Sequence, residues 1–156
     1  MFEFMVLPMS VQDIARVRFS EDVYRVQGLR ADSLSLFMHH ANLQAERDVL
    51  LFDNTKGIVL ASTQQKLDGK GNIYMAGKIT LYAKERSFNS VPNYTLMHFE
   101  QEKSAIIRFE NMEVIRTQTD RFERLLIAGH VQNIEILKQV FGTLQSGCIA
   151  VIFCQF

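Results

Sequence analysis

The sequence predicts an α/β fold with a doubly wound, mostly parallel sheet. Two short apolar runs, residues 49–52 and 148–153, lack the polar alternation of a half-exposed strand and are typical of strands covered on both faces. Stretches with apolar residues at helical spacing separate runs of this kind, as in residues 32–42. Strands that alternate with helices form right-handed βαβ crossovers, so we expect a five-stranded sheet in the order 3-2-1-4-5.

The elements are separated by recognisable start and stop signals. Asp32 is expected to cap the first helix, which ends near Asn42. A turn over residues 53–57 leads into the second helix, and the glycines of residues 68–71 end it. Residues 77–96 have no clear assignment. In chain order we expect helix 32–42, strand 49–52, helix 58–67, strand 72–76, helix 99–109, strand 113–116, strand 125–128, helix 133–141 and strand 148–153.

Length and composition indicate a single globular domain. The 156 residues are enough to bury a core, and 47% hydrophobic with 22% charged residues are ordinary proportions. Cys148 and Cys154 are expected to be small buried residues in a reducing compartment, not a disulfide framework. No apolar run approaches the ~20 residues that cross a bilayer, and the first ten residues lack the basic start of a secretory signal. We therefore expect an intracellular protein.

The positions at which such a sheet binds a nucleotide lack the expected residues. A dinucleotide or S-adenosylmethionine site needs glycines in the turn after the first strand and a carboxylate after the second. The first turn, residues 53–57, has one glycine and the side chain of Lys56, and the second strand ends at Ala76 without an acid. Residues 128–130 follow the fourth strand and lack the carboxylate expected of an enzyme that methylates a base nitrogen. We expect neither a cofactor site nor a catalytic residue.

Two other candidate sites are interpreted as structural. Asp53 and Lys56 share the first turn, but an aspartate there commonly bonds to its own backbone, which favours a turn residue over half of a catalytic pair. His39 and His40 are adjacent, so a helix points them in different directions and they cannot chelate one ion together. No metal site is expected.

Charge is balanced over the whole chain but not along it. There are 17 basic and 17 acidic residues, while residues 54–86 contain six basic and two acidic ones. Four arginines also gather before the first expected helix. An RNA-contacting face and an ordinary solvated surface both fit this pattern.

Three short motifs resemble a known family when their order and spacing are taken together. An Arg-x-Asp-Ser-Leu-Ser element opens the first helix, an acidic-x-x-x-Gly turn follows the first strand, and a Gly-x-Gly element precedes the second. The matching residues are Arg30, Asp32, Ser33, Leu34 and Ser35, then Asp53 and Gly57, then Gly69 and Gly71. With residues 29–77 and 122–153 as a whole, they are similar to the non-catalytic, RNA-binding subunit of the tRNA (adenine-58-N1)-methyltransferase.

The resemblance implies a degenerate Rossmann-like methyltransferase domain over residues 29–156, after a lead-in segment over residues 1–28. Members of this family usually carry an additional N-terminal β domain and a longer C-terminal end, so the domain looks truncated after its fifth strand. The resemblance also implies a nuclear (or cytosolic) heterotetramer with a catalytic subunit that holds the S-adenosylmethionine, while this chain helps to bind tRNA. The residues expected to contact RNA are Arg16, Arg18, Arg25, Arg30, Lys84 and Arg86, with Phe19, Tyr24, Tyr82 and Phe88 as nearby aromatic residues.

Two other functions stay open. One is an active S-adenosylmethionine-dependent methyltransferase with a divergent cofactor motif. The other is a protein-interaction module that has kept the sheet without contacting RNA. The expected final strand is fully apolar and has no covering helix after it, which favours a partner subunit on that side.

Overall fold

A computed structural model describes residues 10–76, 106–129 and 133–154. Within them lies one parallel sheet in the order β3-β2-β1-β4-β5, which confirms the predicted fold class and strand order. Its strands are β1 (Asp48–Asp53), β2 (Asn72–Ala76), β3 (Ile106–Glu110), β4 (Phe122–Ala128) and β5 (Leu144–Phe153).

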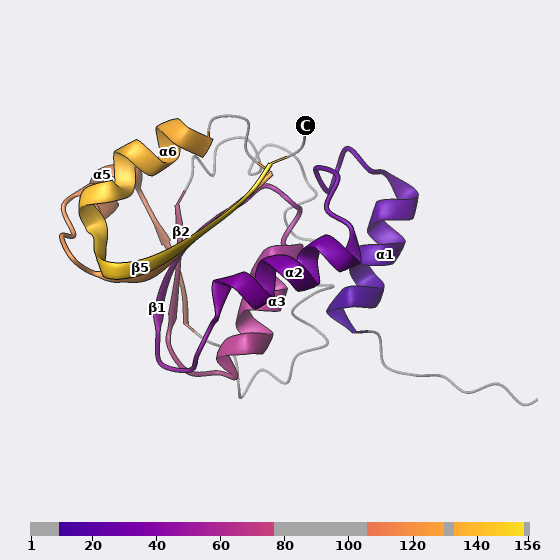
Figure 1. Ribbon diagram of the computed structural model, residues 1–156, viewed down its shortest axis with the longest axis horizontal. Helices are drawn as coiled ribbons and strands as arrows, with labels where there is room; N and C mark the ends of the chain where they lie inside the picture. The colour runs from indigo at the N-terminus through magenta and orange to yellow at the C-terminus, as the bar shows by residue number, and fades with distance from the viewer. Residues whose placement is uncertain (1–9, 77–105, 130–132, 155–156) are drawn as a thin grey trace, which may run out of the picture.

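Helices cover the sheet on both faces (Figure 1). One face carries α2 (Ala31–Ala41) and α3 (Ile58–Leu67), with α1 (Val11–Glu21) packed against both of them. The opposite face carries α5 (Met112–Arg116), α6 (Asn133–Val140) and the 3-10 turn η4 (Phe141–Thr143). No helix among the described residues is long and apolar enough to span a bilayer.

The central strand β1 is buried on both sides, as its apolar sequence predicts. Val49 and Leu51 belong to the core under α1, α2 and α3, whereas Leu50 and Phe52 belong to the core under α5 and α6. Successive side chains of a strand point to opposite faces, so one short apolar run supplies both cores. The strand therefore has no solvated face on which polar residues would alternate.

Helix α1 is not among the elements expected from the sequence, which treated residues 1–28 as a lead-in. Its Val11 and Ala15 side chains are fully buried in the same core as Leu34 of α2. The start signal is a capping box. The Ser10 hydroxyl accepts a hydrogen bond from Asp13 N at 3.2 Å, and the Asp13 carboxylate accepts one from Ser10 N at 3.1 Å.

The third strand was assigned to the wrong segment. A helix was expected over residues 99–109 and a strand over 113–116, but β3 is Ile106–Glu110 and α5 occupies Met112–Arg116. The expectation followed the β-branched pair in Glu113–Val114–Ile115–Arg116 and overlooked Asn111, whose side chain accepts a hydrogen bond from Glu113 N at the helix start. Residues 77–105, including the first part of the expected helix, lie outside the described residues.

The cap of α2 also differs from the prediction. Arg30 is the N-cap residue and makes no side-chain cap hydrogen bond. Asp32 instead lies in the first turn, where its carboxylate accepts a hydrogen bond from Ser33 N at 2.9 Å and pairs with Arg30 Nη2 at 3.0 Å. An acid in the first turn interacts favourably with the helix dipole, and the N-cap lies two residues earlier than predicted. The bounds of α3 and β2 are as predicted.

Candidate functional site

The turn after β1 is organised by Asp53. One carboxylate oxygen of Asp53 accepts hydrogen bonds from Thr55 N at 2.7 Å and from Thr55 Oγ1 at 2.6 Å. The other oxygen accepts a hydrogen bond from Leu60 N in the first turn of α3 at 2.9 Å. Lys56 and Gly57 both have positive φ angles, 59° and 83°, which close the turn. The prediction that Asp53 is a turn residue is confirmed.

This turn already supplies the negative charge that α3 attracts at its N-terminus. In nucleotide-binding turns of doubly wound sheets, the backbone N–H groups at this point face the ligand. Here the amides of Thr55 and Leu60 donate to Asp53 instead. Two amide donors at this turn are therefore occupied by the chain itself.

The carboxyl ends of β1, β4 and β5 are joined by hydrogen bonds. Asn54 donates from its backbone N to Ala128 O at 2.9 Å and from Nδ2 to Gly129 O at 3.0 Å. Gly129 N in turn donates to Phe153 O at 2.9 Å. This is the point where the strand order reverses, which is where doubly wound sheets bind their ligands.

A loop before α2 covers the same point. A Cβ atom placed on Gly129 would lie 2.7 Å from both Cβ and Cγ of Gln27, and 3.5 Å from Cγ2 of Thr55. Gln27 holds a positive φ of 54° and its amide Nε2 donates to Tyr24 O at 3.1 Å. Side-chain atoms of Gln27 thus lie against Gly129, which directly follows β4. Sequence reasoning missed this contact, because Gln27 carries no motif that would place it there.

The other expected cofactor positions are partly described. The described part of β2 ends at Ala76 without an acid, whereas Gly77 and His130 lie outside the described residues. Asn133, the first residue of α6, is buried, and its Oδ1 has no hydrogen-bond partner among the described residues. Among the described residues there is no group of three or more His, Cys, Asp or Glu side chains that could hold a metal ion.

The expected RNA contacts separate into two groups. Arg16 and Arg18 lie on α1, Arg25 lies in the loop that follows it, and Arg30 is the N-cap of α2. Arg16 and Arg30 line one groove between α1 and α2, which Arg18 and Arg25 do not line. Lys84 and Arg86, like the aromatic residues Tyr82 and Phe88, lie outside the described residues.

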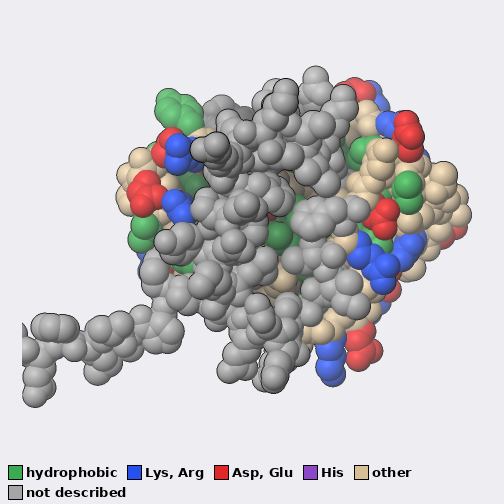
Figure 2. Space-filling view, turned by 180° about the vertical axis from the view of Figure 1, so that it is seen from behind, with side chains coloured by type: hydrophobic (Ala, Val, Ile, Leu, Met, Phe, Trp, Pro, Cys, Tyr) green, Lys and Arg blue, Asp and Glu red, His purple; other side chains and the backbone are tan. Residues whose placement is uncertain are grey.

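Each of the four described arginines pairs with a nearby carboxylate. The nitrogen-to-oxygen distances are 2.9 Å for Arg16–Asp13, 3.0 Å for Arg18–Glu21, 3.4 Å for Arg25–Asp22 and 3.0 Å for Arg30–Asp32. Figure 2 likewise shows acidic and basic side chains next to one another on the described part of one face. Such exposed pairs contribute little stability, so a phosphate can replace the carboxylate, but the region offers no net positive charge.

Comparison with protein families decides the identity of the chain. The model of the Gcd10p family matches residues 1–140. The chain belongs to the Gcd10p family. This is the family of the non-catalytic subunit of the tRNA m1A58 methyltransferase, as the three sequence motifs indicated.

A solved structure supports the fold of this Gcd10p-family chain. The crystal structure of a methyltransferase from Geobacter sulfurreducens superposes with a TM-score of 0.53, at 13% sequence identity, over 90% of this chain and 69% of that one. At this identity the likeness shows the fold alone, which is the Rossmann-like methyltransferase fold. No curated protein matches the sequence.

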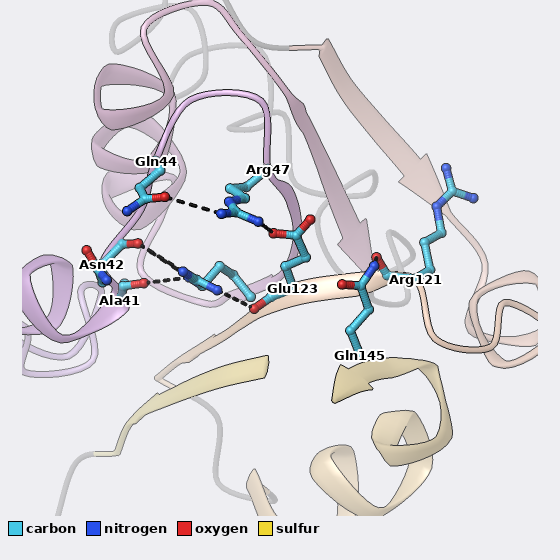
Figure 3. Close-up of polar contacts among 8 residues, drawn as sticks. Ala41, Asn42, Gln44, Arg47, Arg121, Glu123 and Gln145 are labelled. Carbon is cyan, nitrogen blue, oxygen red and sulfur yellow. Dashed lines mark hydrogen bonds and ion pairs between the residues drawn. The ribbon is translucent and has the colours of Figure 1, made fainter. Parts of the chain in front are cut away.

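A second polar cluster of this Gcd10p-family chain is structural. Arg124 on β4 is only 8% exposed, and its guanidinium donates to the carbonyls of Ala41 at 3.1 Å, Asn42 at 3.3 Å and Glu123 at 2.8 Å. The first two carbonyls end α2, where helix carbonyls lack partners of their own. Beside it, Arg47 bonds to Gln44 and to the Glu123 carboxylate (Figure 3). This cluster fixes α2 to the sheet.

Proposed function

We propose that this chain is a non-catalytic subunit that supports formation of N1-methyladenosine at position 58 of tRNA. In this proposal it pairs with a catalytic methyltransferase subunit, forms a heterotetramer with it in the nucleus or the cytosol, and helps to hold tRNA. The observation that carries the proposal lies at the point where the strand order of the sheet reverses, here called the switch point. There Gln27 lies against Gly129 and fills the space beside it.

The filled switch point supports catalytic inactivity because it acts against cofactor binding in two ways. Gln27 takes up space at the ends of β1 and β4, and Asp53 takes the amide donors of the first turn. To bind here, S-adenosylmethionine would have to displace the loop and break the bonds that Asp53 makes. We therefore assign the cofactor to the catalytic subunit, and neither a cofactor nor a catalytic residue to this chain.

Exposed apolar residues support a partner subunit. Ile134 on α6 and Phe141 in η4 are 67% and 70% exposed. In the described part of the chain, β5 pairs with β4 alone, and none of its ten residues is fully buried. Exposed strand edges and large apolar side chains mark surfaces that another chain covers.

The paired arginines bear on how tRNA is held. Phosphate contacts by Lys and Arg supply most non-specific affinity for nucleic acid and make it depend steeply on salt. Because each of the four described arginines among the expected contacts has a carboxylate beside it, we expect weak tRNA binding by this chain alone and tighter binding by the complex. The same pairing favours a second candidate function, a subunit that supports its partner without contacting RNA.

A tRNA titration of the complex at two salt concentrations separates these candidates. One variant carries alanine at all six expected contacts, Arg16, Arg18, Arg25, Arg30, Lys84 and Arg86. We expect it to bind tRNA more weakly and to lose about one unit of salt slope for each phosphate contact removed. The control variant, Arg116→Ala with Lys138→Ala, removes exposed basic residues from the other face of the sheet and is expected to change neither quantity. Unchanged affinity and slope in the six-residue variant would support the second candidate.

A further inference from the structure

We propose that the groove between α1 and the start of α2 binds one unpaired nucleotide of the RNA, with its phosphate on Arg16 and Arg30. The inference rests on the proposed tRNA binding and assigns a subsite to it. It also separates Arg16 and Arg30 from the other expected contacts.

The groove has the size and lining of a small-ligand site. Its volume is about 460 Å³, within the range of about 300 to 1,000 Å³ that is usual for such sites. Its lining includes two guanidinium groups, a carboxylate, an amide, a hydroxyl and an aromatic ring. The residues that supply these groups are Arg16, Arg30, Asp32, Gln12, Ser35 and Phe19.

The start of α2 adds a second attraction for an anion. The N-terminal end of a helix carries partial positive charge and favours phosphate. Arg30, the N-cap residue, makes no side-chain cap hydrogen bond, but the Asp32 carboxylate accepts a hydrogen bond from Ser33 N at 2.9 Å. A phosphate at this end of α2 must therefore compete with Asp32 for the helix amides.

In the described ranges, both arginines are held only by exposed carboxylates. Arg16 and Arg30 are 69% and 64% exposed, and their partners Asp13 and Asp32 are 45% and 66% exposed. Asp32 also lines the groove, so a phosphate on Arg30 must compete with that carboxylate. Bidentate bonds from arginine to phosphate are among the stronger hydrogen bonds in proteins, so a phosphate can replace the carboxylate on an arginine.

Phe19 distinguishes a nucleotide from a bare phosphate. Its ring is half-buried against the core below α1 and also lines the groove. An aromatic side chain beside a phosphate site allows a base to stack, and stacking is tolerant of sequence. The groove therefore fits an unpaired nucleotide better than it fits a base pair.

The test is fluorescence anisotropy with the full chain and a labelled single-stranded uridine oligonucleotide of about ten residues. We expect Arg16→Gln and Arg30→Gln each to weaken binding about fivefold, and Asp32→Asn to tighten it about twofold by removing the competitor. Arg116→Gln is the control, because Arg116 is exposed, bonds to the Gln139 side chain and lies outside the groove. We expect it to change binding less than twofold.

Three outcomes would overturn the proposal that this groove binds a nucleotide. The first is no binding of the oligonucleotide at millimolar protein, and the second is an equal loss for Arg116→Gln and Arg30→Gln with no effect of Asp32→Asn. The third is equal displacement of the oligonucleotide by uridine monophosphate and by inorganic phosphate, which would exclude a role for Phe19. The proposed function fails separately, if the complex binds tRNA no more tightly than the catalytic subunit alone.

Discussion

Replacing Arg124 by methionine tests whether the buried guanidinium holds α2 to the sheet. The substitution keeps a long side chain in the core beside β4 and removes the donors to Ala41 and Asn42. Both carbonyls lie at the end of α2 and would lose these hydrogen bonds. We expect the variant to fold with the same secondary structure and with lower stability.

The expected loss of stability follows from the hydrogen bonds of Arg124. Arg124 donates to three carbonyls, and a hydrogen bond that involves a charged group contributes about 1.5 to 3 kcal/mol. Methionine relieves the cost of burying a charge, which offsets part of the loss. We expect the free energy of unfolding to fall by about 3 kcal/mol, and the Tm to fall by about 6 to 12 °C for a chain of this length.

Urea denaturation followed by circular dichroism measures the change. Arg116→Met is the control, because Arg116 is exposed and, within the part of the chain that the structure describes, bonds only to the Gln139 side chain, at 2.6 Å. We expect the control to stay within about 0.5 kcal/mol of the parent. A loss below about 1 kcal/mol for Arg124→Met, at an unchanged m value, would refute the assignment of Arg124 as the residue that fixes α2.

Two further predictions concern the switch point and the start of α1. Gly129→Ala should lower the free energy of unfolding by about 2 kcal/mol or more, because its φ is +75° and the new Cβ would lie 2.7 Å from Gln27. Adding Gln27→Gly should restore part of that loss. Gly142→Ala is the control, because a Cβ there would have no described atom within 4 Å. No recovery in the double variant would show that Gln27 does not crowd Gly129. At α1, hydrogen bonds from the side chain and then the backbone of Ser10 lower the pKa of Asp13 below 3.8. The carboxylate should therefore stabilise the fold above pH 3.8 and lose this effect as pH falls through its lowered pKa. In urea denaturation, Asp13→Asn should be less stable than the parent at pH 7. The difference in the free energy of unfolding between the two proteins should narrow below pH 3.8. A gap that is constant with pH would contradict the capping role.

The sequence predicts the sheet well where local signals and burial agree. The apolar run of β1 and the stop signal at residues 68–71 gave the positions of β1, α3 and β2, because each signal is complete within a few residues. The prediction from the sequence was wrong at β3, because the β-branched residues of α5 are typical of a strand. There the cap at Asn111 and the pairing of β3 with β2 decide the structure.

The candidate site was only half predictable. The composition of the turn at residues 53–57 showed that the usual glycines are missing, and Asp53 was interpreted correctly as a turn residue. The contact of Gln27 with Gly129 joins residues far apart in the sequence, and neither belongs to a motif that would reveal it. The carboxylates beside the arginines were visible in the sequence, but only the structure shows which carboxylate each arginine meets.

Calorimetric titration of the isolated chain with S-adenosylmethionine tests the central claim most directly. Because Gln27 fills the switch point and Asp53 occupies the donors of the first turn, we predict no binding at ligand concentrations up to about 1 mM. The catalytic subunit, titrated in the same buffer, shows that the ligand is competent. A dissociation constant in the low micromolar range for this chain would contradict the account and support an active methyltransferase.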